Sequence, residues 1–461
     1  MGKRFLVVTE KHIPPPHEFD GGARLINSLR KVLGDSMDVI QFDIDYLRND
    51  GKTKMRFQYP YKESNRFLRR ISNAPFIAEK VLEVSNQYSD ILFVHVSMQF
   101  GFIETNLSGI NTFTFPMFLG SSYQLSGEVV PDLYFELERK VLKITNKIIS
   151  PSYFEKAQLI NDYNVEAYKI KVIPRGIDTI DLDEKLCRIT PSDKINFSSI
   201  GSIKPQKNTI GLIKLFSKIL LHYPNSTLQV IGAVQDKIYE RRLRQEINDL
   251  GISSSVRFLG HVSPSLLKEA LKETHFHITA SNCETFARSS FETLSLGIPN
   301  ICNAKNNAAK QFLEGNSAIQ FYDSENEIIG FIANSILTYE TQTISSINLG
   351  KLYNDNHLSE LLRAELIENP IMCVADFDGT LFHKNEKSRT KDCIENFVKY
   401  PVRVVCTSRS LDSILNELAD LNIDVDYIIA WSGAVITDKI GNILWINGFN
   451  PGDGDLLGFH T

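Results

Sequence analysis

The most informative part of the sequence is one run: Cys283-Glu284-Thr285-Phe286-Ala287-Arg288-Ser289-Ser290-Phe291-Glu292-Thr293-Leu294-Ser295-Leu296-Gly297-Ile298-Pro299. It follows the residues His275 to Ala280, whose apolar positions alternate as in a strand, and it ends in Gly297 and Pro299, which stop a helix. Asn300 to Ala304 predicts the next strand. The sequence therefore predicts a strand, a short loop, a helix and a second strand.

Two glutamates in this run are placed to border one crevice. Glu284 falls in the loop at the carboxyl end of the first strand, and Glu292 lies about two turns along the helix. Between them, the backbone N–H groups and the positive dipole end of the helix form an anion site. Carboxylates that accept hydroxyl protons beside a phosphate site suit a nucleotide sugar. The alternative is a buried helix with two solvated glutamates.

The Glu-x7-Glu spacing and the Leu-Ser-Leu-Gly-Ile-Pro string that follows resemble the donor-site signature of retaining glycosyltransferases of the GT-B fold, of the family 4 type. The resemblance implies that Glu284 faces the hydroxyls of the donor sugar, that Glu292 faces those of the ribose, and that Phe286, Ala287 and Arg288 contact the donor. It also implies an α/β fold with two doubly wound Rossmann-like domains. Transfer would retain the anomeric configuration and need neither a protein nucleophile nor a cofactor.

Length and composition are those of a multidomain globular protein. A chain of 461 residues exceeds the size at which one core keeps growing. Hydrophobic residues make up 43%, charged residues make up 23%, and the net charge of -5 gives no basis for nucleic-acid binding. No apolar run approaches the ~20 residues that cross a bilayer. The six cysteines lack metal-ligand spacing, so we expect a cytoplasmic protein with reduced thiols.

The first half contains further motifs that resemble the same family. Gly21 and Gly22 follow a predicted strand at 4–10 and open a helix, like the glycine loop that meets the donor diphosphate. Ile149 to Ser152 and Val172 to Asp178 match the family at corresponding places, the latter at its interdomain crossing. The polar and acidic stretch 178–193 is then typical of an interdomain linker.

A second alternation of strands and helices begins near residue 196 and predicts another parallel, doubly wound sheet. Lys207, in the loop after its first strand, is placed to neutralise a diphosphate leaving group; a surface lysine is the alternative. Relatives commonly carry Arg where this chain has Ser202, so only half of the usual Arg and Lys clamp is present. Lys204, Arg175 and Arg288 are the candidates to restore the charge.

A second departure from the family concerns a histidine. Relatives often carry one on an N-terminal strand near the donor sugar, and the run Phe113 to Phe118 has none. His95, on the preceding predicted strand, is either its substitute or a core histidine.

Residues 52–70 interleave basic side chains with Phe57, Tyr59, Tyr61 and Phe67. Such a mixture can bind an anionic membrane surface or an acidic acceptor. A solvated loop and helix face is the alternative. We therefore expect either a peripheral membrane contact or an ordinary surface here.

A new core begins at Ile371 and reaches the string Asp376-Phe377-Asp378-Gly379-Thr380. An apolar strand ending in Asp-x-Asp-Gly-Thr resembles the haloacid dehalogenase (HAD) superfamily of phosphatases. The resemblance implies that Asp376 attacks phosphorus, that Asp378 acts as acid and base, and that both hold Mg²⁺. Val404 to Arg409 resembles the second motif of the superfamily, with Thr407 binding phosphate.

The remaining phosphatase motifs are missing from this part of the sequence. A lysine and a later acidic cluster are expected well beyond the hairpin that Ala434 to Ile446 resembles. Gly452 to Asp455 could imitate the acidic cluster but comes early, and a terminal turn is the plainer interpretation. We expect a HAD-like domain with negligible phosphatase activity in this chain, either truncated from a longer protein or structural.

The sequence thus predicts three domains: an acceptor-side Rossmann-like domain at 1–180, a nucleotide-sugar-binding domain at 181–350 and a partial HAD-like domain at 366–461. The predicted reaction moves a sugar from a nucleotide-diphosphate sugar to a sugar, glycolipid or polysaccharide acceptor. Lys207 and Glu284 are the expected catalytic residues. Two other functions stay open: a sugar-phosphate glycosyltransferase with its own phosphatase, resembling sucrose-phosphate and trehalose-phosphate systems, and a non-catalytic nucleotide-sugar-binding scaffold.

Overall fold

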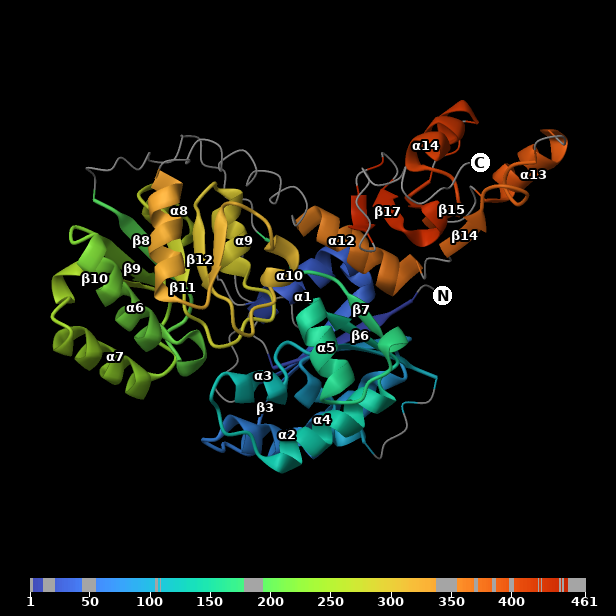
Figure 1. Ribbon diagram of the computed structural model, residues 1–461. Helices are drawn as coiled ribbons and strands as arrows, with labels where there is room; N and C mark the ends of the chain where they lie inside the picture. The colour runs from blue at the N-terminus through green and yellow to red at the C-terminus, as the bar shows by residue number, and fades with distance from the viewer. Residues whose placement is uncertain are drawn as a thin grey trace. The chain divides into compact units, whose positions relative to one another are not determined.

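The computed structural model describes residues 3–10, 21–43, 55–103, 107, 109–177, 194–336, 355–368, 372–383, 387–397, 402–421, 423, 425–438, 441 and 443–446. The chain divides into two compact units, Met1–Arg363 and Ala364–Thr461. The first unit contains two separate parallel sheets, and the second contains one mixed sheet (Figure 1).

The first sheet of the first unit is parallel, with the strand order β3-β2-β1-β4-β5-β6-β7. Its strands are β1 (Phe5–Thr9), β2 (Met37–Asp43), β3 (Met55–Gln58), β4 (Asp90–Val94), β5 (Asn111–Phe115), β6 (Lys147–Ser150) and β7 (Ile170–Val172). Every residue of β1 is buried, as expected for a central strand covered on both faces.

Helices connect these strands. They are α1 (Gly21–Leu33), α2 (Arg66–Ser85), α3 (Gly120–Leu125), α4 (Asp132–Ile144) and α5 (Tyr153–Asn161), with the short 3₁₀ segments η1 (Gly34–Ser36), η2 (Val96–Phe102) and η3 (Ala167–Lys169). α1 buries one apolar face, which includes Leu25, Ile26 and Leu29. η2 packs so closely on α2 that a Cβ at Gly101 would lie 2.2 Å from the carbonyl oxygen of Ala74.

The second sheet is also parallel, with the order β10-β9-β8-β11-β12-β13. Its strands are β8 (Asn196–Ile200), β9 (Thr227–Ile231), β10 (Val256–Gly260), β11 (Phe276–Thr279), β12 (Asn300–Asn303) and β13 (Ile319–Tyr322). The helices are η4 (Pro205–Lys207), α6 (Thr209–His222), α7 (Lys237–Asp249), η5 (Ser253–Ser255), α8 (Pro264–Lys272), α9 (Arg288–Ser295) and α10 (Lys310–Leu313). The rings of Phe197, Phe216 and Phe276 centre its core.

One further helix of the first unit, α12 (Asp355–Arg363), packs against α1. The two strand orders confirm the predicted pair of doubly wound domains, because in each sheet the chain moves outward from a central strand in one direction and then in the other. The predicted linker 178–193 lies outside the described residues.

The second unit has the strand order β14-β15-β16-β17-β18. β14 (Met372–Asp376), β15 (Val402–Cys406) and β16 (Tyr427–Ala430) are parallel, and β17 (Val435–Asp438) and β18 (Ile443–Ile446) form the predicted antiparallel hairpin. Its helices are α13 (Lys387–Phe397), α14 (Leu411–Asp420), a π-helical turn η6 (Ala364–Glu368) and η7 (Trp431–Gly433). Phe377, Val405 and Ile428 lie in its core.

Some expectations need correction. The strand expected to carry His95 ends at Val94, and His95 follows it with φ of 101°, a strained conformation for a residue other than glycine. The stretch 52–70, interpreted as a membrane or acceptor contact or as a solvated loop and helix face, also contains a strand that was not predicted: Met55–Gln58 forms β3, and Arg66 begins a 20-residue helix. No helix among the described residues is long and apolar enough to cross a membrane.

The described cysteines agree with the expectation of reduced thiols. Cys283 and Cys302 are free and buried, and Cys373, Cys393 and Cys406 are free and partly buried. Cys187 lies outside the described residues.

Candidate active site

A pocket of about 540 Å³ opens where the second sheet reverses its strand order. β8 and β11 are neighbours at this point, so the loops that leave their carboxyl ends diverge and leave a crevice. Gly201 and Ser202 follow β8, and Glu284 follows β11. The pocket is lined by Arg24, Met117, Arg175, Ile200, Gly201, Ser202, Lys204, Lys207, Ile231, Gly232, Ala233, Gln235, His261, Val262, Leu267, Glu284, Thr285, Phe286, Ala287, Arg288, Ser289 and Glu292.

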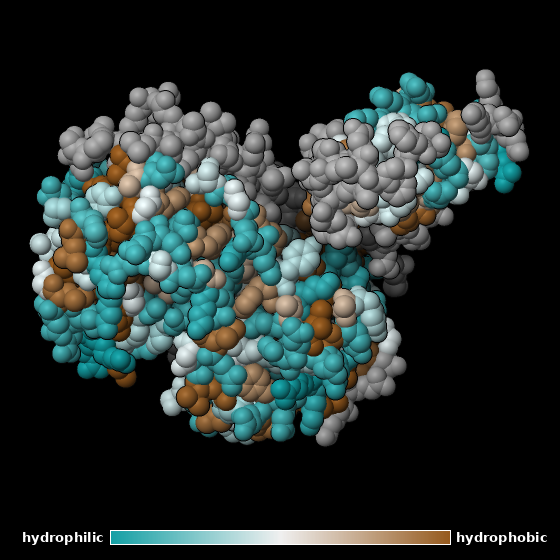
Figure 2. Space-filling view, viewed as in Figure 1, coloured by the Kyte–Doolittle hydropathy of each residue, from teal (hydrophilic) through white to brown (hydrophobic). Residues whose placement is uncertain are grey.

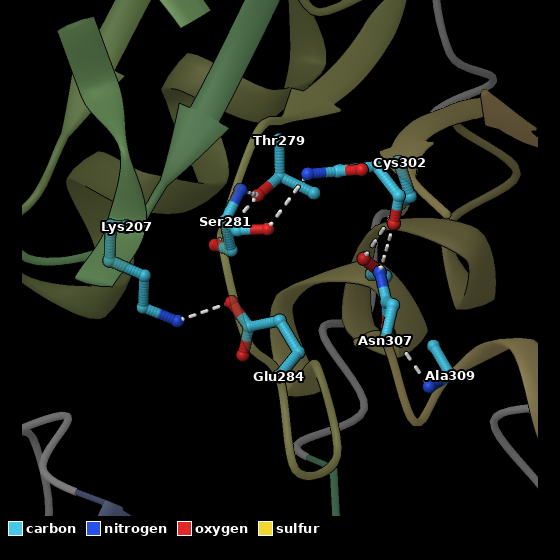
Figure 3. Close-up of polar contacts among 9 residues, drawn as sticks. Lys207, Thr279, Ser281, Glu284, Cys302, Asn307 and Ala309 are labelled. Atoms are coloured by element: carbon cyan, nitrogen blue, oxygen red, sulfur yellow. Dashed lines mark hydrogen bonds and ion pairs between the residues drawn. The ribbon is translucent and has the colours of Figure 1, made fainter. Parts of the chain in front are cut away.

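Lys207 and Glu284 form an ion pair in the pocket wall, with 2.6 Å between Nζ and Oε1 (Figure 3). Lys207 is the last residue of η4, and the buried Glu284 is fixed through its backbone. The Glu284 N–H donates to the carbonyl of Asn306, and its carbonyl accepts from Ala308, both at 2.9 Å. The ion pair therefore joins the loop after β8 to the loop after β11, and the backbone hydrogen bonds join the loop after β11 to the loop after β12.

Glu292 accepts a hydrogen bond from Arg24 of α1, with 2.9 Å between Oε1 and the guanidinium nitrogen. Both side chains are largely buried, at 9% and 15% exposure. Arg24 comes from the helix of the first sheet and Glu292 from α9 of the second. The pocket is therefore bordered by side chains from both sheets of the first unit.

The start of α9 faces the pocket without a capping side chain. Its N-cap residue, Ala287, has a left-handed backbone with φ of 61°, and no side chain of the N-cap accepts from the first turn. Residues from Thr285 to Ser289 line the pocket, so the positive dipole end of α9 borders it. A left-handed alanine costs on the order of 1 to 3 kcal/mol, which is typical of functional turns.

The pocket floor depends on two glycines. Gly201 follows β8, and Gly232 follows β9 with φ of 150°. A Cβ at Gly232 would lie 2.1 Å from the Gly201 carbonyl oxygen, so only glycine allows the two loops to approach this closely.

Cations outnumber carboxylates around the pocket. Five lining side chains are Lys or Arg and two are Glu, an excess of three positive charges at neutral pH. Burial lowers the pKa of Arg175 to about 10, and this guanidinium stays charged at pH 7. The pocket is therefore suited to an anion that carries at least two negative charges.

Most predicted donor-site residues come together here: Ser202, Lys207, Glu284, Phe286, Ala287, Arg288 and Glu292 all line the pocket. Gly21 and Gly22 form the first turn of α1, and among the described residues of that helix Arg24 is the one that lines the pocket. His95 is buried behind β4, where its Nδ1 accepts from the Ser97 N–H at 3.2 Å.

Sequence reasoning missed Arg24. The signal was present in Gly-Gly-Ala-Arg at the start of a helix, but its partner Glu292 lies 268 residues further along the chain. No local pattern predicts such a pair.

The HAD-like motif of the second unit is more open. Asp376 ends β14 and is exposed, and Asp378 has a side chain that is 48% exposed. Arg409 binds both oxygens of Asp378, at 2.5 and 2.8 Å, and also Glu417 at 3.0 Å. Thr407 is buried, with its hydroxyl accepting from the Arg409 N–H. Gly452 to Asp455 lies outside the described residues.

Asp376 and Asp378 are the two residues to which the HAD resemblance assigns Mg²⁺. They supply two carboxylates, of which Asp378 is already paired with Arg409. No group of three or more His, Cys, Asp or Glu side chains suited to a metal occurs in the described part of the chain.

Three family models match successive parts of the chain. Residues 46–180 match Glycosyltransferase Family 4, residues 188–333 match Glycosyl transferases group 1, and residues 373–453 match haloacid dehalogenase-like hydrolase. The first two cover most of the first unit, and the third covers the second unit's motif.

Among curated proteins, the chain is 25% identical over 363 residues to an alpha-monoglucosyldiacylglycerol synthase from Streptococcus pneumoniae, covering 68% of this chain and 80% of that protein. It is also 25% identical to a D-inositol 3-phosphate glycosyltransferase from Geodermatophilus obscurus, over 36% of this chain and 40% of the relative.

Solved structures share the fold at low sequence identity. Sucrose-phosphate synthase from Thermosynechococcus elongatus superposes with a TM-score of 0.65 at 16% identity, covering 80% of this chain and 98% of the other. HepE from Anabaena in complex with UDP and glucose gives a TM-score of 0.61 at 16% identity, covering 80% and 100%. With two parallel sheets facing one pocket and matching family models on both sides of it, the chain is a GT-B glycosyltransferase fused to a HAD-like domain.

Proposed function

We propose that the first unit transfers a sugar from a nucleotide-diphosphate sugar to an acceptor, with retention of the anomeric configuration. The observation that carries this proposal is the excess of cations around Glu284 and Glu292 at the reversal point of the second sheet. A diphosphate supplies the negative charge that the pocket lacks, and sugar hydroxyls supply donors for its carboxylates.

The donor's diphosphate is expected to lie between Lys207 and the first turn of α9. Lys207 would supply a positive charge, and the first turn of α9 the positive end of a helix dipole, to the leaving group as it gains negative charge. Glu292 would accept hydrogen bonds from the ribose, and Glu284 from the sugar. Because each carboxylate is paired with a cation in the structure, donor binding would share or exchange these contacts.

The acceptor is proposed by analogy with a relative. The Streptococcus pneumoniae protein is named a synthase of a glucosylated diacylglycerol, so a lipid acceptor is the first to test, ahead of a soluble sugar or a polysaccharide. Neighbours solved with UDP and UDP-glucose make these the first donors to test.

The membrane contact proposed for 52–70 now depends on fewer residues. Tyr59 and Arg70 are buried, and Arg70 is ion-paired with Glu10 and bonded to Tyr134. Of the described hydrophobic residues in this stretch, Tyr61 and Leu68 are exposed, at 55% and 45%. In the face drawn in Figure 2, apolar residues form separate patches among hydrophilic ones. A membrane contact would therefore use Tyr61 and Leu68 and not Arg70.

A transfer assay tests the proposed function. The intact chain is incubated with UDP-, GDP- and ADP-sugars and with diacylglycerol vesicles or soluble sugars, and the released nucleoside diphosphate is measured. We expect release that depends on the acceptor, and NMR of the product should show the donor's anomeric configuration. An inverted product would contradict retention, and no release with any pair would favour the scaffold function.

The second candidate is a glycosyltransferase for sugar phosphates whose product is dephosphorylated by the HAD-like domain. The match of residues 373–453 to haloacid dehalogenase-like hydrolases and the fold similarity to sucrose-phosphate synthase favour it. Transfer to fructose 6-phosphate or glucose 6-phosphate in the same assay, in preference to lipid, would support it.

A further inference from the structure

Arg175 lies in the pocket wall. Among the described residues, no carboxylate accepts a hydrogen bond from its guanidinium. It follows β7, and its terminal nitrogen is 3.5 Å from the sulfur of Met117. A thioether is a weak acceptor, so this contact leaves the donor capacity of the guanidinium largely unused. Arg175 lines the same pocket as Ser202, where relatives of the resembling family carry an arginine.

A buried carboxylate is coupled to Arg175 through its electric field. Ser152-x-x-Glu155 is the pattern of a capping box at the start of α5, and the Ser152 hydroxyl does accept from the Glu155 N–H at 3.1 Å. The return bond is not made, because the Ser152 N–H points to the Ser150 hydroxyl at 3.4 Å. Both Glu155 carboxylate oxygens are buried without a hydrogen-bond partner in the described structure.

Charges around this pair explain the arrangement. Burial raises the pKa of Glu155 to about 7, and the charge of Arg175 opposes that rise. Arg288, also in the pocket wall, lowers the pKa of Arg175, which means that the two guanidiniums repel each other. Burial raises the pKa of Glu138 and of Cys283, and the charge of Glu155 adds to both increases. Arg175 therefore interacts with one negative group, Glu155, and with one positive group, Arg288.

We propose that Arg175 is the second cation of the diphosphate site, in place of the arginine that Ser202 replaces, and that Glu155 is its buried counter-charge. This inference rests on the proposed function, because the diphosphate is that of the donor. An anion that contacts both Arg175 and Arg288 relieves their repulsion and accepts the unused hydrogen bonds of Arg175. Glu155 compensates the charge of Arg175 while the pocket holds no anion.

The two residues should then affect anion binding in opposite directions. Calorimetry at pH 8 measures the affinity of the intact chain for UDP, uridine and inorganic pyrophosphate. Arg175→Ala should weaken the binding of UDP and of pyrophosphate by on the order of tenfold to a hundredfold, as expected for the loss of a charged hydrogen bond. The affinity for uridine should stay unchanged. Glu155→Gln removes the compensating charge and should tighten both anions. Arg241→Ala, an exposed arginine on α7, is the matched control.

Each outcome is decisive. If the unaltered chain binds UDP and Arg175→Ala binds it equally well, the inference is wrong and the proposed function stands. If Glu155→Gln weakens UDP as Arg175→Ala does, Glu155 is not a counter-charge. If the unaltered chain binds neither UDP, GDP, ADP nor pyrophosphate, the proposed function itself fails. Should Arg175→Ala not fold, Arg175→Met tests the same loss with the side-chain volume kept, and an unchanged pyrophosphate affinity would overturn the inference.

Discussion

Each unit has a pair of carboxylates beyond the carboxyl end of a parallel strand, Glu284 and Glu292 in the loop and helix after β11 and Asp376 and Asp378 at the end of β14, and the two pairs have different surroundings. Glu284 and Glu292 are buried, and each is bonded to a cation that reaches it from another element. Asp376 and Asp378 are exposed, and Arg409 occupies both oxygens of Asp378. Water screens charges at the second site, whereas the first site keeps an excess of positive charge in a partly enclosed pocket. Similar topology thus leaves one carboxylate pair buried beside cations and the other exposed to water.

Lys207→Ala should break the first site with the largest effect. Removing a cation that stabilises leaving-group charge should lower turnover about 10²-fold to 10³-fold. The product-release assay measures this loss. Lys218→Ala is a matched control, because Lys218 lies on α6, is ion-paired with Glu325 and is not among the described residues that line the pocket. Turnover within a few-fold of the unaltered chain would remove Lys207 from catalysis.

The buried carboxylates of the first unit should also make its stability depend on pH. Burial raises the pKa of Glu138 to about 8, although Tyr163 donates to it at 2.7 Å. The pKa of Glu138 is higher in the folded chain than in the unfolded chain, so the unfolded chain loses this proton first as pH rises. The contribution of Glu138 to folded-state stability is therefore complete below about pH 4.5 and is lost as pH rises toward 8. The free energy of unfolding should therefore fall by about 1.4 kcal/mol per pH unit in that window.

Urea unfolding at pH 5 to 8 checks this prediction and separates the units. Both tryptophans, Trp431 and Trp445, lie in the second unit, so their fluorescence follows that unit while far-ultraviolet circular dichroism follows both. The dichroism transition should shift with pH, and Glu138→Gln should flatten its slope. An unaltered slope in the variant would show that Glu138 does not titrate in this range.

Glu292 should contribute to binding through the ribose hydroxyls of the nucleotide, and its effect on affinity should be smaller than the effect of Lys207 on turnover. For the nucleoside diphosphate that binds, removing both ribose hydroxyls should weaken binding about tenfold in the unaltered chain, since each lost hydrogen bond is worth about 1 kcal/mol. In Glu292→Gln the same change of ligand should matter less. Equal losses in both proteins would place the ribose elsewhere.

Substituting Asp376 in the second unit should have no measurable effect on phosphate release. With p-nitrophenyl phosphate and Mg²⁺, we expect phosphate release by the intact chain to equal that of Asp376→Asn. The reason is that Asp378 is held by Arg409 and the described residues offer no three-ligand metal group. Mg²⁺-dependent release that Asp376→Asn abolishes would show that the second site is a working phosphatase.

The sequence predicted the parts of the fold that depend on local patterns. The strand predicted at Asn300 to Ala304 forms as Asn300–Asn303, and the helix predicted to open at Gly21 and Gly22 forms as Gly21–Leu33, because apolar period and turn residues coincide there. The run from 283 to 299 also gave the loop and helix that carry both glutamates.

Long-range pairs could not be predicted in this way. Arg70 resembled a solvated surface arginine, and only the folded chain brings Glu10 and Tyr134 to it. The interactions of Arg24 and Glu155 likewise involve residues on other elements, Glu292 and Arg175. A charged residue in a helix has the same local sequence signal whether it faces water or a distant partner, so burial of such residues depends on tertiary structure.

The central claim is that the pocket beside Lys207 and Glu284 binds a nucleoside diphosphate. A thermal-shift screen of the intact chain against UDP, GDP, ADP and CMP and their sugar conjugates tests it most directly. A ligand at about 100 times its Kd should add about 2.7 kcal/mol to folded-state stability. We predict a selective rise in Tm with one nucleoside diphosphate, smaller for its monophosphate and reduced in Glu292→Ala. No shift with any nucleotide would contradict the claim.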